Sequence, residues 1–303
     1  MKKQVAFVSQ GCNLIGHVYY PDNMEPEEQY AAVIVLGSWT TVKEQMAGTY
    51  ADRLSHQGFI ALAFDARGYG ESEGEPRNWE NPTYKMEDTQ AALRFMQSLP
   101  EVDESRIALC GISAGAMYAL MTAAHDEGVA AVCTVASWLH DVDAVPLLYG
   151  GEEGVKQKLR AAHAAKWRYA DEGVLETVPK ISTTDPNAAM YGSFDYYLNP
   201  QRGGIPQWDS AHFAVMSWED WLHCDPMPLA KDVTVPVIMV HSDGCVLPEQ
   251  TKQFFHLIAS PIKKLVWYDT DIPFPNQQFA FYDQDEVVNY AIYKVSSFLK
   301  QHI

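Results

Sequence analysis

The chain has 303 residues and a net charge of −17. This acidity argues against nucleic acid and anionic membrane surfaces as partners, because both repel a negative protein. With 47% hydrophobic residues the chain can bury a large core, and its length suits one large domain or a domain with an insertion. Strand-like sequence starts within the first ten residues and no apolar run could span a bilayer, so we expect neither a signal peptide nor a membrane segment.

The cysteines are odd in number and widely spaced, without a C-x-x-C pair. They are Cys12, Cys110, Cys133, Cys224 and Cys245. This pattern indicates reduced thiols in a cytoplasmic protein, not a disulfide framework or a metal site. The sequence also lacks phosphate-loop, dinucleotide-binding and H-E-x-x-H motifs, so we expect no cofactor and no bound metal.

Short apolar runs alternate with helix-like segments over residues 1–137. The expected strands are Gln4–Ser9, Leu14–Tyr20, Ala31–Leu36, Gly58–Phe64, Arg106–Cys110 and Val129–Ala136. The expected helices are about Val42–Gln57, about Tyr84–Ser98 and a third directly after Ser113. The first two strands form a hairpin. The continuous hydrophobicity of the others predicts a parallel sheet covered on both faces, with functional groups at the carboxyl ends of its strands.

The alternation stops over residues 138–230, which are rich in aromatic side chains. Helices are expected there at about 152–169 and about 211–223. A long segment between two sheet strands is best interpreted as an inserted cap over the active face, and the alternative is an aromatic packing layer without ligand contact. Such a cap suggests an apolar or aromatic acyl group as ligand, and it could also form an oligomer interface.

The regular pattern resumes over residues 231–303, which complete the core begun by residues 1–137. Strands are expected at Val235–His241 and Lys264–Tyr268, and helices at about Pro248–Ala259 and about Asp285–Gln301. The fold class is therefore α/β, with a mostly parallel eight-stranded sheet and helices on both faces.

The stretch Gly111-Ile112-Ser113-Ala114-Gly115 lies between an expected strand and an expected helix. This is the G-x-S-x-G pattern of a nucleophile elbow in its strand–turn–helix setting. A serine on such a turn has an exposed hydroxyl, and the two glycines allow neighbouring backbone to pass very close. The start of the following helix directs N–H groups toward any oxyanion that forms near Ser113.

Together with three further segments, this stretch resembles the α/β-hydrolase superfamily, in particular its bacterial dienelactone-hydrolase-like and peptidase-like serine hydrolases. The segments are DARGYGESEG at Asp65–Gly74, HSDGCVLP at His241–Pro248 and FAFYD at Phe279–Asp283. The resemblance covers nearly the whole sheet but not the inserted segment.

The resemblance implies a role for individual residues. Ser113 corresponds to the nucleophile and the Ala114 N–H to one oxyanion donor. The loop after the third strand corresponds to the other donor, for which we expect the Trp39 N–H, with Thr40 next. The Trp39 side chain can also pack in the pocket wall, since the expected role uses only its backbone. Asp243 corresponds to the catalytic acid, although an aspartate there could instead cap the following helix.

This chain departs from the family pattern at the position of the general base. The family has a histidine directly before the segment matching FAFYD, where this chain has Gln278. An amide accepts no proton at neutral pH, so a serine without another base stays a weak nucleophile. His140 and His212 are candidate replacements, with ordinary packing or surface roles as the alternative. We interpret His241 as structural.

Two functions follow from these observations. The first is a serine hydrolase, or an acyltransferase, acting on a small or medium ester, thioester or amide through an acyl-enzyme on Ser113. The second is a catalytically impaired binding protein, in which Ser113 and Gln278 both hydrogen-bond a ligand. Either function requires a small-molecule partner.

Overall fold

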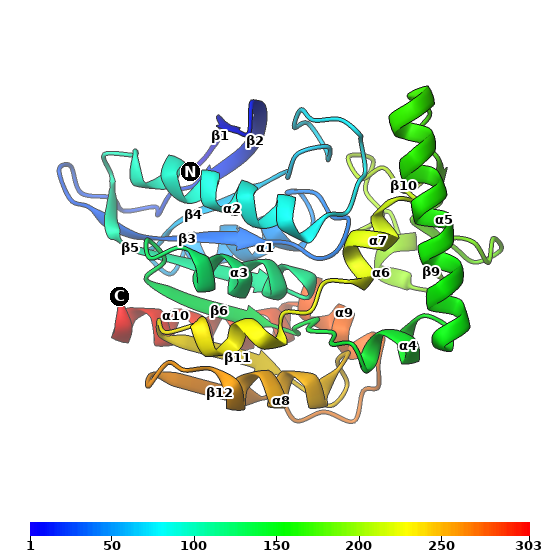
Figure 1. Cartoon of the computed structure of the whole chain (residues 1–303). Helices are drawn as coiled ribbons and strands as arrows, with labels where there is room; N and C mark the ends of the chain where they lie inside the picture. The colour runs from blue at the N-terminus through cyan, green and yellow to red at the C-terminus, as the bar shows by residue number, and fades with distance from the viewer.

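The computed structural model describes residues 1–303 and centres on an eight-stranded sheet with the order β1-β2-β4-β3-β5-β6-β11-β12 (Figure 1). Its strands are β1 (Lys2–Ser9), β2 (Cys12–Tyr19), β3 (Tyr30–Leu36), β4 (Ile60–Phe64), β5 (Val102–Ile112), β6 (Ala131–Val135), β11 (Val237–His241) and β12 (Lys263–Trp267). β2 runs antiparallel to β1 and β4, whereas the pairs from β4 to β12 are parallel. The predicted hairpin and mostly parallel sheet are confirmed.

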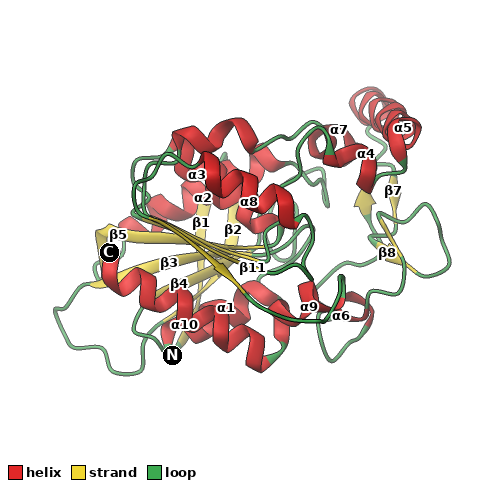
Figure 2. Cartoon of the chain, turned by 90° about the horizontal axis from the view of Figure 1, so that it is seen from below, coloured by secondary structure: helices red, strands yellow, loops and turns green.

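The apolar runs of the central strands are buried on both faces of the sheet. In β3, Ala32, Ile34 and Leu36 join one hydrophobic cluster, while Val33 and Val35 join the other. The helices α2 (Pro82–Gln97), α3 (Ala114–His125) and α8 (Pro248–Leu257) cover the first face. The helices α1 (Met46–Ser55), α9 (Asn276–Asp283) and α10 (Asp285–His302) lie on the second (Figure 2).

The segment between β6 and β11 contains most of the remaining elements. They are α4 (Ala144–Leu148), α5 (Gly151–Glu172), β7 (Thr177–Val178), β8 (Ile181–Ser182), β9 (Met190–Tyr191), α6 (Asp195–Leu198), β10 (Phe213–Ala214), α7 (Ser217–Leu222) and the 3₁₀ helix η1 (Met227–Asp232). Most of them gather beyond the carboxyl ends of the parallel strands (Figures 1 and 2). η1 instead returns along the core and packs against α3 and α8. No helix combines the length and the apolar character that a bilayer crossing needs.

Two predictions for individual elements were wrong or incomplete. The helix expected over about 211–223 is only the six-residue α7, because Phe213 and Ala214 pair with β7 as the short strand β10. Phe213 is buried against the rings of Trp39 and Trp218, a tertiary contact that favours the extended pairing over local helix propensity. The segment FAFYD, given no structure from the sequence, lies within α9.

Candidate active site

Ser113 lies on a sharp turn between β5 and α3, in the conformation that the elbow pattern predicts. Its φ of 56° and ψ of −120° are a strained combination for a residue with a side chain. A Cβ at Gly111 would overlap the carbonyl of Gly115, and a Cβ at Gly115 would overlap the carbonyls of Leu36 and Gly37. Both glycines are therefore sterically required, because backbone passes where a side chain would lie.

The structure supplies N–H groups for an oxyanion beside this turn. Ala114 is the first residue of α3, where a backbone N–H has no partner within the helix. Trp39 follows β3, and its N–H makes no hydrogen bond within the protein. The Thr40 N–H, by contrast, donates to the Glu80 carboxylate at 2.9 Å and is not free for a substrate. The oxyanion role of the Trp39 N–H therefore stays a prediction that its free donor allows, whereas the Thr40 N–H is already occupied.

Glu80 is a buried carboxylate that fixes this loop and that the sequence analysis missed. Besides the Thr40 N–H, it accepts hydrogen bonds from the hydroxyls of Tyr69 at 2.8 Å and Tyr118 at 2.5 Å, and it pairs with Lys85 at 3.4 Å. The conformation of Thr40 needs this support, because its φ of 62° is left-handed. Glu80 stands in a polar loop, and no local pattern marks it, since its partners come from separate segments of the chain.

Hydroxyl and amide groups surround Ser113. The Tyr282 hydroxyl lines the same cavity as Ser113 and lies 3.4 Å from Ser38 Oγ. The Gln278 Nε2 group donates to the same hydroxyl at 3.1 Å. Burial raises the pKa of Tyr282, so its phenol stays protonated at neutral pH. None of these groups accepts a proton at neutral pH as a histidine would.

The Gln278 amide is fixed by contacts on both of its ends. The second Nε2 hydrogen bond goes to the Ala136 carbonyl at 2.8 Å, and Oε1 accepts from the Val246 N–H at 3.1 Å. Both N–H donors are therefore used, and the side chain is held beside Ser113 in one orientation.

Asp243 makes no hydrogen bond to Gln278, whose partners are other groups. Its side chain is 73% exposed and lies 3.5 Å from Lys252. It also does not cap α8, whose N-cap is Leu247 without a side-chain cap. An acid of this kind acts by orienting an imidazole, and this site presents none. The acid role of Asp243 stays a prediction without a contact that supports it.

The two histidines considered as replacement bases lie elsewhere. His140 is buried; its Nδ1 accepts from Trp138 Nε1 at 3.0 Å, so its Nε2 carries the proton and donates to the Trp221 carbonyl at 3.0 Å. Burial lowers the pKa of His140 to about 4, and no lone pair remains for Ser113. His212 is exposed and pairs with Asp209 at 3.0 Å, at a different cavity.

His241 is buried against Trp267, and neither of its ring nitrogens has a hydrogen-bond partner. Burial lowers its pKa to about 3. This environment supports the structural interpretation of His241, because a buried imidazole without an ion pair stays neutral.

Ser113 opens into a cavity of about 570 Å³ with mostly apolar walls. Ser38, Gln278 and Tyr282 line it together with Ser113. The aromatic lining side chains are Trp39, Trp138, Tyr149, Tyr191, Phe194, Tyr197, Trp221, Phe274 and Phe279. Several of them belong to the segment 138–230, so this segment contributes walls to the cavity. Lys158 of α5 brings a cation to the lining, 4.1 Å from the centre of the Trp218 ring, and burial lowers its pKa.

Residues 31–271 match the protein family described as serine aminopeptidase, S33. The chain belongs to this family of α/β-hydrolases. The fold class predicted from the sequence is thereby confirmed, as a mostly parallel eight-stranded sheet with helices around it.

This α/β-hydrolase is similar to several fungal and bacterial proteins. It is 31% identical to the thiohydrolase aneE of Aspergillus aculeatus, over 88% of this chain and 84% of that protein. It is 39% identical to the polyketide transferase af380 of Aspergillus fumigatus, over 77% and 78% of the two chains. The crystal structure of hypothetical protein PA2218 from Pseudomonas aeruginosa superimposes with a TM-score of 0.86, covering 100% of this chain and 94% of that chain at 24% identity. The family and the two named fungal relatives support a hydrolytic or acyl-transferring role, whereas the similarity to PA2218 shows the fold alone.

Proposed function

We propose that this α/β-hydrolase takes an acyl group from a thioester, or from a comparably activated ester, onto Ser113. The observation that carries the proposal is the strained serine on the lining of an apolar cavity, with the unpaired Trp39 N–H on the adjacent loop. The names of two relatives, thiohydrolase and polyketide transferase, support acyl chemistry of this kind.

In the proposed reaction the Ser113 Oγ attacks the thioester carbonyl carbon. The resulting oxyanion is stabilised by the N–H groups of Trp39 and Ala114, each of which is typically worth about 3 kcal/mol to a transition state. Collapse of the intermediate breaks the carbon–sulfur bond and leaves an ester on Ser113. The serine proton passes to solvent, and the departing thiolate takes up a proton from solvent to become the thiol product.

Because no histidine lies beside Ser113, the proposed reaction needs a leaving group that departs without being protonated. An alkoxide must be protonated as it leaves, which is the task of the histidine in an ordinary triad. A thiol has a pKa of about 8.5, so it departs as a thiolate without an acid. Tyr282 and Gln278 can position the substrate and the serine hydroxyl, but they supply no such proton transfer.

The acyl group in this proposal is apolar or aromatic, since aromatic side chains dominate the cavity walls. Residues 138–230 then act as a cap that shields the acyl group from water. Without a base to activate water, the acyl-enzyme is long-lived, and an incoming nucleophile stronger than water accepts the acyl group more readily.

Intact-protein mass spectrometry tests the proposal. Incubation with the N-acetylcysteamine thioester of an aromatic acid should add the mass of one acyl group, and the matched alkyl oxyester should add none. Ser113→Ala should remove the adduct, because it leaves the cavity in place without the nucleophile. Absence of an adduct and of free thiol release from the wild-type protein would overturn the proposal.

The second candidate is a binding protein without turnover. The fully hydrogen-bonded Gln278 amide favours it, because a side chain fixed in this way suits recognition better than proton transfer. In that case wild-type protein and Ser113→Ala should both bind the thioester, with neither adduct nor thiol release.

A further inference from the structure

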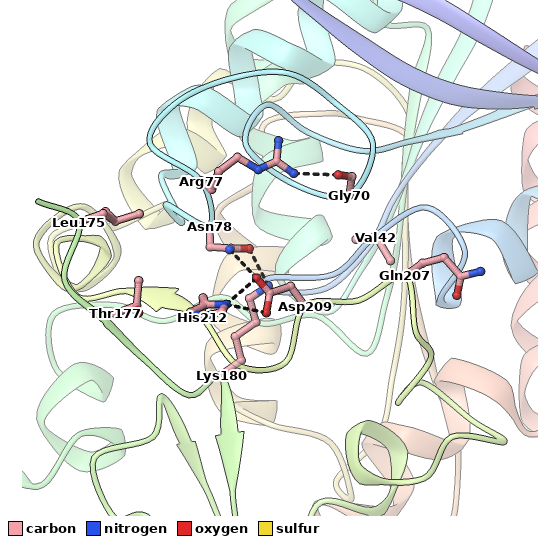
Figure 3. Close-up of a pocket in the computed structure, with 10 residues that line it drawn as sticks. All are labelled: Val42, Gly70, Arg77, Asn78, Leu175, Thr177, Lys180, Gln207, Asp209 and His212. Carbon is pink, nitrogen blue, oxygen red and sulfur yellow. Dashed lines mark hydrogen bonds and ion pairs between the residues drawn. The ribbon is translucent and has the colours of Figure 1, made fainter. Parts of the chain in front are cut away.

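A second cavity, of about 520 Å³, lies beside the same loop that carries Trp39. We call it the Lys180 cavity and define it by Arg77, Asn78, Lys180, Asp209 and His212 (Figure 3). It shares no lining residue with the Ser113 cavity, and its lining is mostly polar. The proposed acyl chemistry assigns no role to it.

Lys180 is an almost fully buried ammonium group in this cavity. Its side chain is 1% exposed, and Nζ donates to Asn78 Oδ1 at 2.9 Å. No carboxylate oxygen lies within 4.0 Å of Nζ, and the nearest aromatic rings, those of Tyr69 and Trp208, are centred 5.2 and 5.6 Å away. A buried ammonium without an anionic contact is costly, and burial accordingly lowers the pKa of Lys180 to about 7.

The carboxylate of the cavity, Asp209, is held by other donors. It accepts from Asn78 Nδ2 at 2.9 Å, from His212 Nδ1 at 3.0 Å and from the Ala211 N–H at 3.0 Å. Asn78 thus hydrogen-bonds both Lys180 and Asp209, as Figure 3 shows. The Asp209 carboxylate lies more than 4.0 Å from Lys180 Nζ, so it stabilises the ammonium only by a longer-range electrostatic interaction.

A second cation of the lining also has no carboxylate partner. The Arg77 guanidinium donates to the carbonyls of Ser72 and Gly70, the latter at 2.7 Å, and makes no ion pair. Figure 3 places Arg77 and Lys180 on opposite sides of Asn78. The cavity therefore contains two lysine or arginine cations and one aspartate, in a chain whose net charge is −17.

From this arrangement we propose that the Lys180 cavity binds a small anionic ligand whose phosphate or carboxylate group contacts Lys180, with Arg77 adding attraction from the other side of Asn78. The group would supply the negative charge that the cavity lacks, and hydrogen bonds from charged donors to such an anion are among the stronger ones in proteins. The volume admits a small organic anion as well as inorganic phosphate.

Isothermal titration of the full chain with inorganic phosphate and, separately, with succinate tests the proposal. Chloride at matched ionic strength controls for screening. Saturable binding of phosphate identifies a phosphate site, saturable binding of succinate identifies a carboxylate site, and binding of neither overturns the proposal. Lys180→Met should weaken binding by roughly tenfold or more. Lys263→Met is the matched control, since it removes a partly buried lysine without an ion pair that lines neither cavity, and it should leave the affinity unchanged.

Asp209→Asn keeps the proposal testable even where Lys180→Met does not fold. Measured at pH 5.5, well below the pKa of about 7 of Lys180, removal of the only carboxylate of the lining should tighten anion binding by a few-fold, an effect that loss of structure cannot imitate. Unchanged or weaker binding in Asp209→Asn, or equal binding in Lys180→Met and the wild type, would rule out this site.

Discussion

Replacing Glu80 by glutamine keeps the shape of the side chain and removes the charge at the centre of a buried network. The carboxylate is fully buried and accepts from the Thr40 N–H and from the hydroxyls of Tyr69 and Tyr118. It is also the only ion-pair partner of Lys85, whose side chain is 10% exposed. Glutamine would present an NH₂ group to some of these donors and leave the ammonium of Lys85 unpaired.

The size of the effect follows from that unpaired charge. Removing one partner of a buried ion pair typically costs about 3–5 kcal/mol, and hydrogen bonds to a charged acceptor lose strength when the acceptor becomes neutral. We expect Glu80→Gln to lower the free energy of unfolding by about 3–5 kcal/mol. Acylation of Ser113 should also slow, because Thr40 loses the partner that fixes the loop of Trp39.

Urea unfolding measures the stability change. The matched control is Glu249→Gln, which removes an exposed carboxylate paired with Lys252 at 2.8 Å and should cost no more than about 1 kcal/mol. The double variant Glu80→Gln/Lys85→Met should recover part of the loss, because it removes the unpaired ammonium. A loss below about 1 kcal/mol for Glu80→Gln would refute the reasoning.

Three further predictions concern the elbow, the missing base and the buried histidines. Gly115→Ala should abolish acylation of Ser113 and lower the yield of folded protein, since its Cβ would overlap two carbonyls of the neighbouring loop; circular dichroism and the adduct assay check this, and an active Gly115→Ala would contradict it. Gln278→His should speed release of the acyl group by about tenfold or more, measured as decay of the adduct, because it places a base at the serine. His140 and His241 have folded pKa values of about 4 and about 3, so the unfolded state binds more protons below pH 6.5 and stability falls between pH 6.5 and pH 4. By pH 4.5 each histidine lowers the free energy of unfolding by about 2–3 kcal/mol relative to pH 7.5. His140→Asn should therefore show a smaller difference in stability between pH 7.5 and pH 4.5, measured by urea unfolding. An unchanged difference would count against this reasoning.

For the general base, the sequence could suggest candidate residues but not the directions of their side chains. His140 was a reasonable candidate because it follows β6, whose carboxyl end borders the site. The direction of its ring depends on Trp138 and on the Trp221 carbonyl, which is 81 residues away in the sequence. In the same way, Asp243 follows β11 as expected, but its side chain turns toward Lys252 in α8.

The sequence by itself determined the sheet, the elbow and the absence of a histidine before FAFYD. Continuous apolar runs bury both faces of a parallel sheet, and the spacing of Gly111, Ser113 and Gly115 is readable because a sharp turn is a local structure. The tertiary structure decided the Glu80 network, the fixed amide of Gln278 and the unpaired charge of Lys180. Each of these depends on polar groups from distant segments meeting in the buried interior, where one missing or added partner changes the balance of charge.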